Sequence, residues 1–418
     1  MIRSHLTAFG VGAGLALLAA GAFALIAPKI AEAEKFGEGV HVVNIGGGDR
    51  GSFHLKENAI EIEATWNGKF EFAAQGRSLS SLKGRLEIET GKDGAARKVE
   101  FSSRDGEVTK QVYVAGKSLP PGPEADGVAA DVLQLFARSS SVNAEGRVKA
   151  LLAEGGKEAA IEEIANLVGG HATGAYIEAL AHAAPLTSAD VSALAARAAA
   201  VESDYSKRTA IVALLNVKDI DQSAAAEILR AAKAIESDHE LRLIVEKLTE
   251  KPLGDRQLDT VVSLIEGIDG DHEVRLSIAA LLKSGNVSDD AAAKALELAA
   301  DSIDGDYELR LAVEAAGERV RNEAVGAAAI DAIGSLDGAH DRRLAIEAIA
   351  DLLGAQSSNW KPLIAAAAAI DGDYERRLAI EKIASSAPDE PDIRAALRKA
   401  AESIPSDHER NLALRALD

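Results

Sequence analysis

Four histidines occupy equivalent positions in a repeating sequence and are the residues best suited to bind a transition metal. They are His239, His272, His340 and His408, and neighbours among them stand at least 33 residues apart. Helices that pack against each other place such equivalent side chains roughly 10 Å apart. Zinc–nitrogen bonds are only about 2 Å long. These histidines therefore cannot converge on one ion, and the sequence predicts no metal site.

Three Asp-Gly-Asp strings, at 269–271, 304–306 and 371–373, resemble the opening of a calcium-binding loop. An EF-hand loop needs Gly at its sixth position and Glu at its twelfth. The first string has Val274 and Ala280 there, and the other two strings fail in the same way. We therefore expect no calcium site.

Catalytic motifs are also missing from the sequence. The chain has no cysteine, which excludes disulfides, thiolate ligands and cysteine nucleophiles. It contains no His-Glu-x-x-His, Gly-x-Ser-x-Gly or Walker pattern. The glycine-rich stretch at 46–51 lacks the Lys-Ser/Thr ending of a phosphate loop and fits a surface turn better. We expect a protein without enzyme activity or cofactor.

One repeated motif contains most of these residues and predicts the architecture. It consists of an aliphatic residue, two small or acidic residues, Asp, an aromatic ring, two variable residues and Arg. The clearest copy begins at Ile303, and other copies begin at Val201, Ile235, Ile268, Leu336, Ile370 and Ile404. An eroded copy begins at Leu167, with His171 at the ring position but Gly170 and Gly174 in place of Asp and Arg. Copies recur every 33 to 35 residues, which is typical of a stacked array.

The Asp and Arg of each copy lie four residues apart, so on a helix they would face each other as a weak exposed ion pair. Two interpretations remain open. The residues form either a structural ladder, in which each Arg also reaches the next repeat, or a recognition stripe along one edge. The Tyr or His between them would act as a packed ring with a polar tip. The candidate residues are Asp204, Tyr205, Arg208, Asp238, His239, Arg242, Asp271, His272, Arg275, Asp306, Tyr307, Arg310, His340, Arg343, Asp373, Tyr374 and Arg377.

Helical hairpins must position these residues. Apolar residues recur at helical spacing between Ala292 and Ile303, before the motif. A second helix begins within the motif, where Ser237 and Glu240 have the spacing of a capping box. We expect an α-solenoid of about eight 34-residue hairpins over 167–418.

A β domain is expected at 36–119, where apolar and polar residues alternate, as in Ile60, Ile62 and Ala64. Asn67-Gly68 and Asp105-Gly106 are typical of hairpin turns. The pattern predicts an antiparallel meander of five or six strands with one buried face. A Pro-rich linker at 120–125 and a helical cap at 126–166 would join it to the array. The fold class is thus α+β.

The first 35 residues read as a targeting segment. Arg3 and His5 precede an uncharged run at 6–27. A cleaved signal peptide and a retained membrane anchor both fit this run. Either places the remainder outside the cytoplasmic membrane, in the periplasm of a Gram-negative cell or anchored to the inner membrane facing it.

The charge distribution limits the choice of partner. The formal net charge is −20, and residues 124–418 contain 31 basic and 52 acidic side chains. An array this acidic would repel phosphate backbones, which excludes nucleic acid as an expected partner. A protein or peptide of basic or mixed charge, including a membrane protein, fits better.

The period and the paired helices resemble HEAT-type repeats. More narrowly, three features resemble a group of bacterial envelope proteins: the strands from Gly51 to Gly68, the segment at 81–84, and the Ser/Gly-Asp-Tyr/His-x-x-Arg repeats. Similar regions occur beside, or fused behind, membrane metallopeptidases of the BlaR type. This chain lacks the metallopeptidase motif, so the resemblance implies at most a sensor or accessory role.

Two functions follow as expectations. The first is a non-catalytic envelope scaffold that binds a protein or peptide along the acidic repeat surface. The alternative is a sensor or accessory protein that regulates a membrane protease or a transcriptional signalling system.

Overall fold

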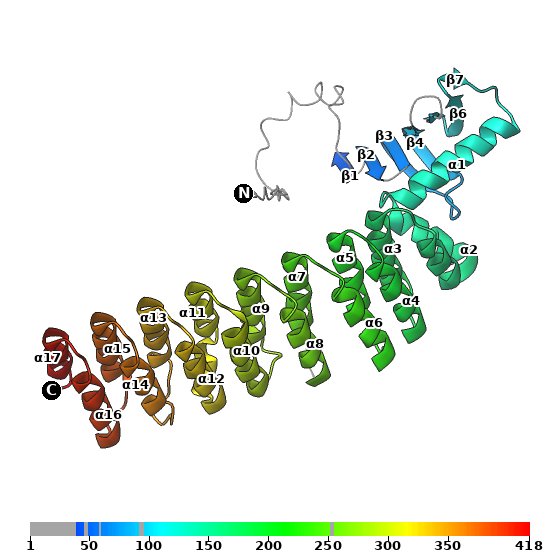
Figure 1. Ribbon diagram of the computed structural model, residues 1–418. Helices are drawn as coiled ribbons and strands as arrows, with labels where there is room; N and C mark the ends of the chain where they lie inside the picture. The colour runs from blue at the N-terminus through cyan, green and yellow to red at the C-terminus, as the bar shows by residue number, and fades with distance from the viewer. Residues whose placement is uncertain (1–38, 46–48, 58–59, 92–95, 251–254) are drawn as a thin grey trace, which may run out of the picture.

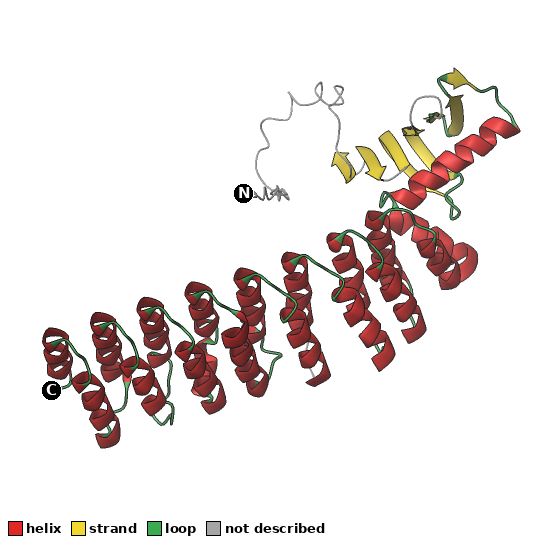
Figure 2. Cartoon of the chain, viewed as in Figure 1, coloured by secondary structure: helices red, strands yellow, loops and turns green. Residues whose placement is uncertain are grey.

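The computed structural model describes residues 39–45, 49–57, 60–91, 96–250 and 255–418. It places an antiparallel sheet at one end of a long array of helical hairpins, which confirms the expected α+β class (Figures 1 and 2). The expected targeting segment and the glycine-rich stretch at 46–48 lie outside the described residues. Within the described part of the chain, no helix is both long and apolar enough to cross a membrane.

The sheet is a simple meander in which each strand pairs antiparallel with the next. Six strands of at least seven residues are followed by a short seventh. The strands are β1 (Gly39–Ile45), β2 (Arg50–Glu57), β3 (Ile60–Phe72), β4 (Leu79–Thr90), β5 (Arg97–Arg104), β6 (Glu107–Val114) and β7 (Lys117–Ser118). Side chains alternate between buried and exposed along β3 and β4, so one face is apolar and the other polar.

The prediction of a turn at Asn67-Gly68 is wrong, because β3 runs through both residues without interruption. Gly68 pairs directly with Gly84 on β4, and both have positive φ angles, 112° and 111°. A Cβ atom on Gly68 would lie 1.7 Å from the carbonyl oxygen of Lys83. The two strands thus approach closely where the two glycines face each other. In the sequence alone, such a glycine after Asn cannot be distinguished from the glycine of a hairpin turn.

The first helix, α1 (Pro123–Ser139), belongs to the sheet domain. It begins inside the expected 120–125 linker, and its buried residues share one core with the sheet. Phe136 packs against Phe53 and Phe72, with ring centroids 5.5 and 5.7 Å apart. The expected cap at 126–166 is therefore divided between two cores, because an open sheet must cover its apolar face before it can be stable.

The remaining helices form the array. They are α2 (Ala144–Ala165), α3 (Gly170–Ala183), α4 (Ser188–Ala199), α5 (Asp204–Leu215), α6 (Gln222–Ala232), α7 (Asp238–Thr249), α8 (Asp255–Ile265), α9 (Asp271–Lys283), α10 (Asp289–Ser302), α11 (Asp306–Glu314), α12 (Glu323–Gly334), α13 (Ala339–Ala350), α14 (Trp360–Ala368), α15 (Asp373–Ser386), α16 (Pro391–Glu402) and α17 (Asp407–Ala416). A short 3-10 helix, η3 (Gly317–Arg321), precedes α12. From α3 onwards, odd-numbered helices form one row and even-numbered helices a second (Figure 1). Their apolar residues form one continuous core.

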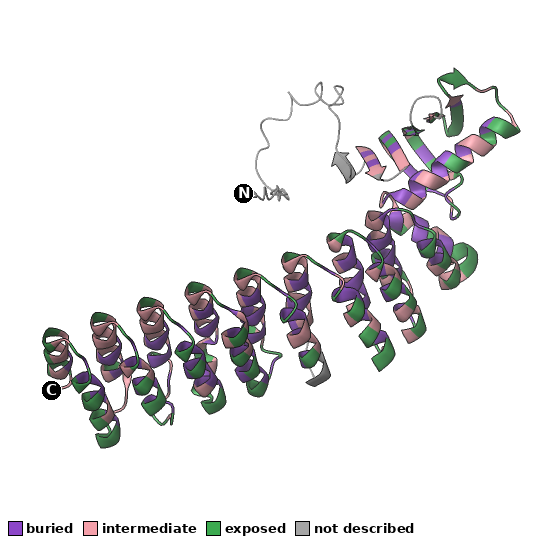
Figure 3. Ribbon diagram, viewed as in Figure 1, coloured by how far each residue is buried: buried purple, intermediate pink, exposed green. Residues whose placement is uncertain are grey.

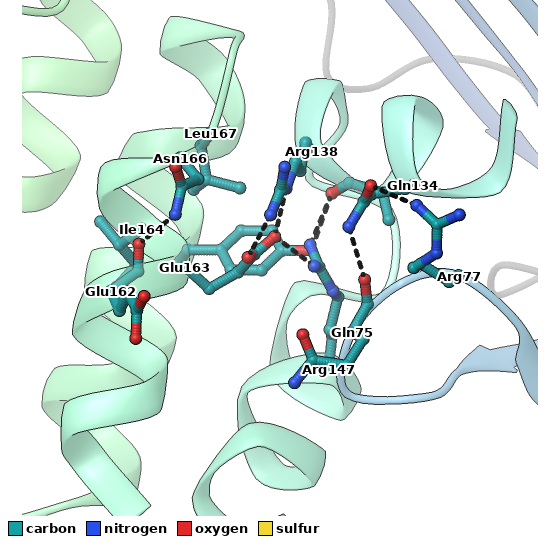
Figure 4. A network of polar contacts seen from close by, with 12 residues as sticks. Gln75, Arg77, Gln134, Arg138, Arg147, Glu162, Glu163, Ile164, Asn166 and Leu167 are labelled. Atoms are coloured by element: carbon teal, nitrogen blue, oxygen red, sulfur yellow. Dashed lines mark hydrogen bonds and ion pairs between the residues drawn. The ribbon is translucent and has the colours of Figure 1, made fainter. Parts of the chain in front are cut away.

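A buried ionic network joins the two parts (Figure 4). The Arg147 side chain is fully buried and pairs with Glu163, which lies on the other side of a sharp kink in α2 at Gly155 and Gly156. It also donates to the carbonyl oxygen of Ala74, in the loop between β3 and β4, and to the hydroxyl of Tyr176 on α3. Glu163 accepts two further hydrogen bonds, of 2.7 and 2.8 Å, from Arg138 on α1. Because these bonds hold sheet, α1, α2 and α3 together, the junction is fixed in orientation.

Candidate functional site

The motif Asp lies at the first position of α5, α7, α9, α11 and α15, and there it binds the following repeat. The Asp238 carboxylate accepts hydrogen bonds from the backbone N–H groups of Asp269 and Gly270, at 3.2 and 2.9 Å. Asp204, Asp271 and Asp306 each bind two amides in the same way, and Asp373 binds the amide of Ser406. Each carboxylate thus satisfies backbone donors in the loop that precedes the next odd-numbered helix.

The motif Arg also binds the following repeat. Arg377 donates to Glu409 at 2.5 Å, and Arg310 donates to Asp341 at 2.8 Å. The same contact joins Arg208 to Glu240, Arg242 to Glu273, Arg275 to Glu308, and Arg343 to Glu375. Four of these arginines also pair with a glutamate four residues later on their own helix, namely Arg242, Arg310, Arg343 and Arg377.

The expected ion pair between Asp and Arg of one motif does not form in the described repeats. Each side chain instead crosses to the neighbouring helix, where the Asp finds amide donors and the Arg finds a carboxylate. The glutamates that bind the arginines stand three residues after the N-cap, where a capping box would use them. Ser237 does accept from the N–H of Glu240, but the Glu240 side chain is directed to Arg208. Only the serine half of the expected capping box is present at Ser237.

The ring between Asp and Arg is exposed rather than packed. Tyr205, Tyr307 and Tyr374 are 53, 58 and 56 % exposed, and they are three of the five large apolar side chains exposed in the described residues. The guanidinium of each motif Arg lies 5.0 to 5.2 Å from the centroid of its own tyrosine. Where the ring is His239, His272 or His340, the Arg lies within hydrogen-bonding distance of Nδ1 instead. Every such ring therefore rests on an arginine that is itself held by a carboxylate.

These rings follow one edge of the array. Each stands at the second residue of an odd-numbered helix, and the N-terminal ends of these helices lie side by side along the upper edge (Figure 1). Figure 3 shows exposed residues at these ends and buried residues on the helix faces between the rows. We call the row of Tyr205, His239, His272, Tyr307, His340, Tyr374 and His408 the aromatic ridge. Structural ladder and exposed stripe thus coexist, because Asp and Arg join the repeats while the ring faces solvent.

The structure also shows a cavity that the sequence interpretation missed. It has a volume of about 840 Å³ and lies over α3, between α2 and α5, with Tyr205 at its border. His171 lies in its wall, 2.8 Å from the Ser141 hydroxyl, and burial lowers the pKa of this imidazole. The sequence signal was the erosion of the motif at Gly170 and Gly174, which marks where the regular ladder stops.

No metal centre is visible in the described segments, where no three His, Cys, Asp or Glu side chains lie close enough together to hold an ion. His239, His272 and His340 instead each face a glutamate of the next repeat, at 3.5 to 3.8 Å.

Comparison with known proteins adds no assignment: the chain matches no protein-family model, and no curated protein is significantly similar to it. The ridge and the cavity are therefore the features that bear on function.

Proposed function

We propose that the protein is a non-catalytic scaffold of the bacterial cell envelope, with HEAT-like repeats that bind a protein or peptide partner along the aromatic ridge. The observation that carries this proposal is the exposure of Tyr205, Tyr307 and Tyr374 at equivalent positions of one edge. Beyond its contact with the arginine, which contributes about 0.5–1 kcal/mol, a ring exposed by more than half adds little to the stability of the fold. Tyrosine and arginine are the residue types most enriched at the energetic centres of protein interfaces.

The contacts beneath the rings support binding rather than chance exposure. Arg310 bonds to Asp341 in the next repeat and to Glu314 on its own helix, and the Tyr307 ring lies over its guanidinium. A side chain held from several directions has lost its conformational freedom before a partner arrives. Binding then costs less entropy than it would for mobile side chains.

The repeat spacing suits an extended partner. Adjacent packed helices place neighbouring rings roughly 10 Å apart, which is about three residues of an extended chain. The acidic excess of residues 124–418 favours a partner with basic or mixed charge. The expected targeting segment, and the resemblance to envelope proteins, support a periplasmic location, with the N-terminus either cleaved or retained as an inner-membrane anchor.

A second candidate is an accessory protein that regulates a membrane protease or a transcriptional signalling system. The ionic junction around Arg147 and Glu163 favours it, because an orientation fixed between sheet and array could convey partner binding from one to the other. In this case the polar face of the sheet would dock on the regulated protein.

The scaffold is tested by capture of partners from the cell envelope with the tagged full-length chain. The variant Y205A/Y307A/Y374A should bind the captured partner about tenfold more weakly or worse, because each ring buried in an interface contributes about 1 kcal/mol or more. The matched control Y205F/Y307F/Y374F keeps the rings and should retain binding. Circular dichroism should show both variants equally folded. Unchanged capture by the alanine variant would contradict the ridge, and capture of a membrane protease independent of the rings would favour the accessory role.

A further inference from the structure

The eroded repeat differs from the regular repeats at two neighbouring positions. Five odd-numbered helices carry Arg followed by Leu, namely Arg242-Leu243, Arg275-Leu276, Arg310-Leu311, Arg343-Leu344 and Arg377-Leu378, whereas α5 has Arg208-Thr209. At the equivalent positions α3 carries Gly174 and Ala175. Both are much smaller, and both line the 840 Å³ cavity. The loss of an arginine and a leucine from one unit thus coincides with a cavity there.

A glutamate remains where the arginine is missing. In four regular repeats the Glu four residues after the Arg accepts from that Arg, as Glu314 does from Arg310 and Glu381 from Arg377. Glu178 occupies this place relative to Gly174 and is exposed in the cavity wall. Neither a hydrogen bond nor an ion pair engages its carboxylate within the described part of the chain. Glu178 is therefore the acidic half of the Arg–Glu pair that four other repeats form, and α3 has no arginine to complete it.

The chain cannot refill this position itself. A Cβ atom on Gly174 would lie 2.7 Å from the carbonyl oxygen of Ser206 on α5, so α3 and α5 approach too closely for a side chain there. The cavity nevertheless reaches Gly174 from the solvent side, between the walls formed by α2 and α5. Apart from the Lys149 ammonium group in the wall, a cation must reach the cavity from solvent.

The other lining groups define what would fit. Glu145 on α2 is a second exposed carboxylate of the cavity, and Lys149 is its one ammonium group. Small residues of α3, from Gly174 to Ala183, form the floor. The lining positions of α3 run from His171 to Ala183, which is about 18 Å at 1.5 Å per residue. This length equals about five residues of an extended chain.

We propose that this cavity binds an arginine or lysine side chain presented by an extended peptide segment, with the guest cation beside Glu178 on the solvent side of Gly174. The inference rests on the proposed function, because Tyr205 borders both the cavity and the aromatic ridge, so one peptide could occupy both. It adds the position of the anchor and its chemistry: a guanidinium or ammonium group beside the Glu178 carboxylate, in a cavity that Glu145 and small residues of α3 also line.

The test is isothermal titration of the full-length chain with two blocked pentapeptides. One is acetyl-Ala-Ala-Arg-Ala-Ala-amide, and the other replaces Arg with citrulline, which has nearly the same shape but no charge. The Arg peptide should bind at least about tenfold more tightly than the citrulline peptide. E178Q should remove most of this difference. E297Q, which changes an exposed carboxylate on α10 far from the cavity, should bind like the original protein.

A second variant tests the cavity without touching charge. A175L introduces the leucine found in five other repeats and should prevent binding of the Arg peptide, because the leucine side chain would fill part of the cavity. Equal binding of both peptides, no binding of the Arg peptide to the folded chain, or unchanged binding by E178Q would each overturn the inference. Failure of the ridge is distinguishable, because Y307A/Y374A should weaken partner capture while leaving pentapeptide binding intact.

Discussion

The Asp271 carboxylate lies 2.7 Å from the backbone nitrogen of Gly305, 34 residues further along the chain. The same bond recurs from Asp238 to Gly270 and from Asp306 to Gly338. It cannot form at the next step, because Ala339 stands at the Asp position and has no carboxylate. The Ala339 side chain nevertheless faces Gly372, since its Cβ would lie 3.5 Å from a Cβ atom on that glycine. One step of the ladder therefore lacks the bond that its neighbours have.

The substitution A339D should restore this bond. An Asp at the first residue of α13 would accept from the amides of Asp371 and Gly372 and would also interact favourably with the helix dipole. We expect a gain of about 1 kcal/mol in local stability. Hydrogen exchange of these two amides should become slower. A339N, which keeps an acceptor oxygen without the charge, should give a smaller effect, and faster exchange in A339D would contradict the assignment.

Removal of an existing bond should have the opposite effect. D306A leaves the amides of Asp337 and Gly338 without their acceptor, and the expected cost is about 1–2 kcal/mol. The measurement is again amide exchange, which should accelerate at the start of α13 more than in α7. Uniform acceleration along the whole array would show that Asp306 acts through something other than this bond.

The ionic junction should be the most sensitive position for substitution. E163Q removes the carboxylate from Arg147, whose side chain has no solvent exposure, and we expect a loss of about 3–5 kcal/mol. Trp66 in the sheet and Trp360 in the array report on the two regions separately by fluorescence during urea unfolding. The Trp66 transition should shift to lower urea. R398Q, at an exposed pair on α16, serves as the control and should leave it unchanged.

Acid should weaken the same junction. Burial alone would raise the pKa of Glu163, but Arg138 and Arg147 outweigh burial, and the net pKa is lowered. A carboxylate with a lowered folded-state pKa stabilises fully above its unfolded value of about 4.3. That stability is lost as the pH falls through the folded-state pKa. Below about pH 4.3 the Trp66 transition should therefore move to lower urea in the original protein, and E163Q should show less of this dependence.

Partner binding should weaken with salt. The array is acidic, and a basic partner would be attracted over a distance set by the Debye length, about 10 Å at 0.1 M and 3 Å at 1 M. The association rate should fall more than the dissociation rate rises, as surface plasmon resonance of the captured partner would show. An association rate independent of salt would argue against a basic partner while leaving the aromatic ridge untested in this experiment.

The sequence predicted the architecture well because periodicity can be recognised from residue spacing alone, without any information on contacts. The 34-residue recurrence of the motif was enough for the array, and alternation was enough for the sheet. The docking of α1 was not predicted, because its apolar residues would suit a sheet as well as a repeat. Phe136 shows this: nothing in its spacing distinguishes packing on Phe53 from packing on another helix.

The contacts of the candidate site were harder to predict for a related reason. Sequence spacing shows that Asp306 and Arg310 lie four residues apart, but it gives no measure of the neighbouring helix. In the structure that helix offers better partners, amides for the Asp and Asp341 for the Arg. The cavity depends on what is missing at Gly174 and Ala175, and a missing side chain becomes informative only when its regular neighbours are seen in place.

The inter-repeat bonds of the motif Asp and Arg side chains point in one direction, to the repeat that follows the motif. Asp238 and Arg242 hold the start of α9, and Asp271 and Arg275 hold the start of α11. During synthesis the earlier repeat emerges first. The backbone amides of each new loop can then bind the Asp carboxylate of a repeat that is already folded, so each repeat acts as a template for the next. Shortening such an array from either side would uncover part of the shared core, but only removal of the earlier repeat would strip backbone amides of their acceptors.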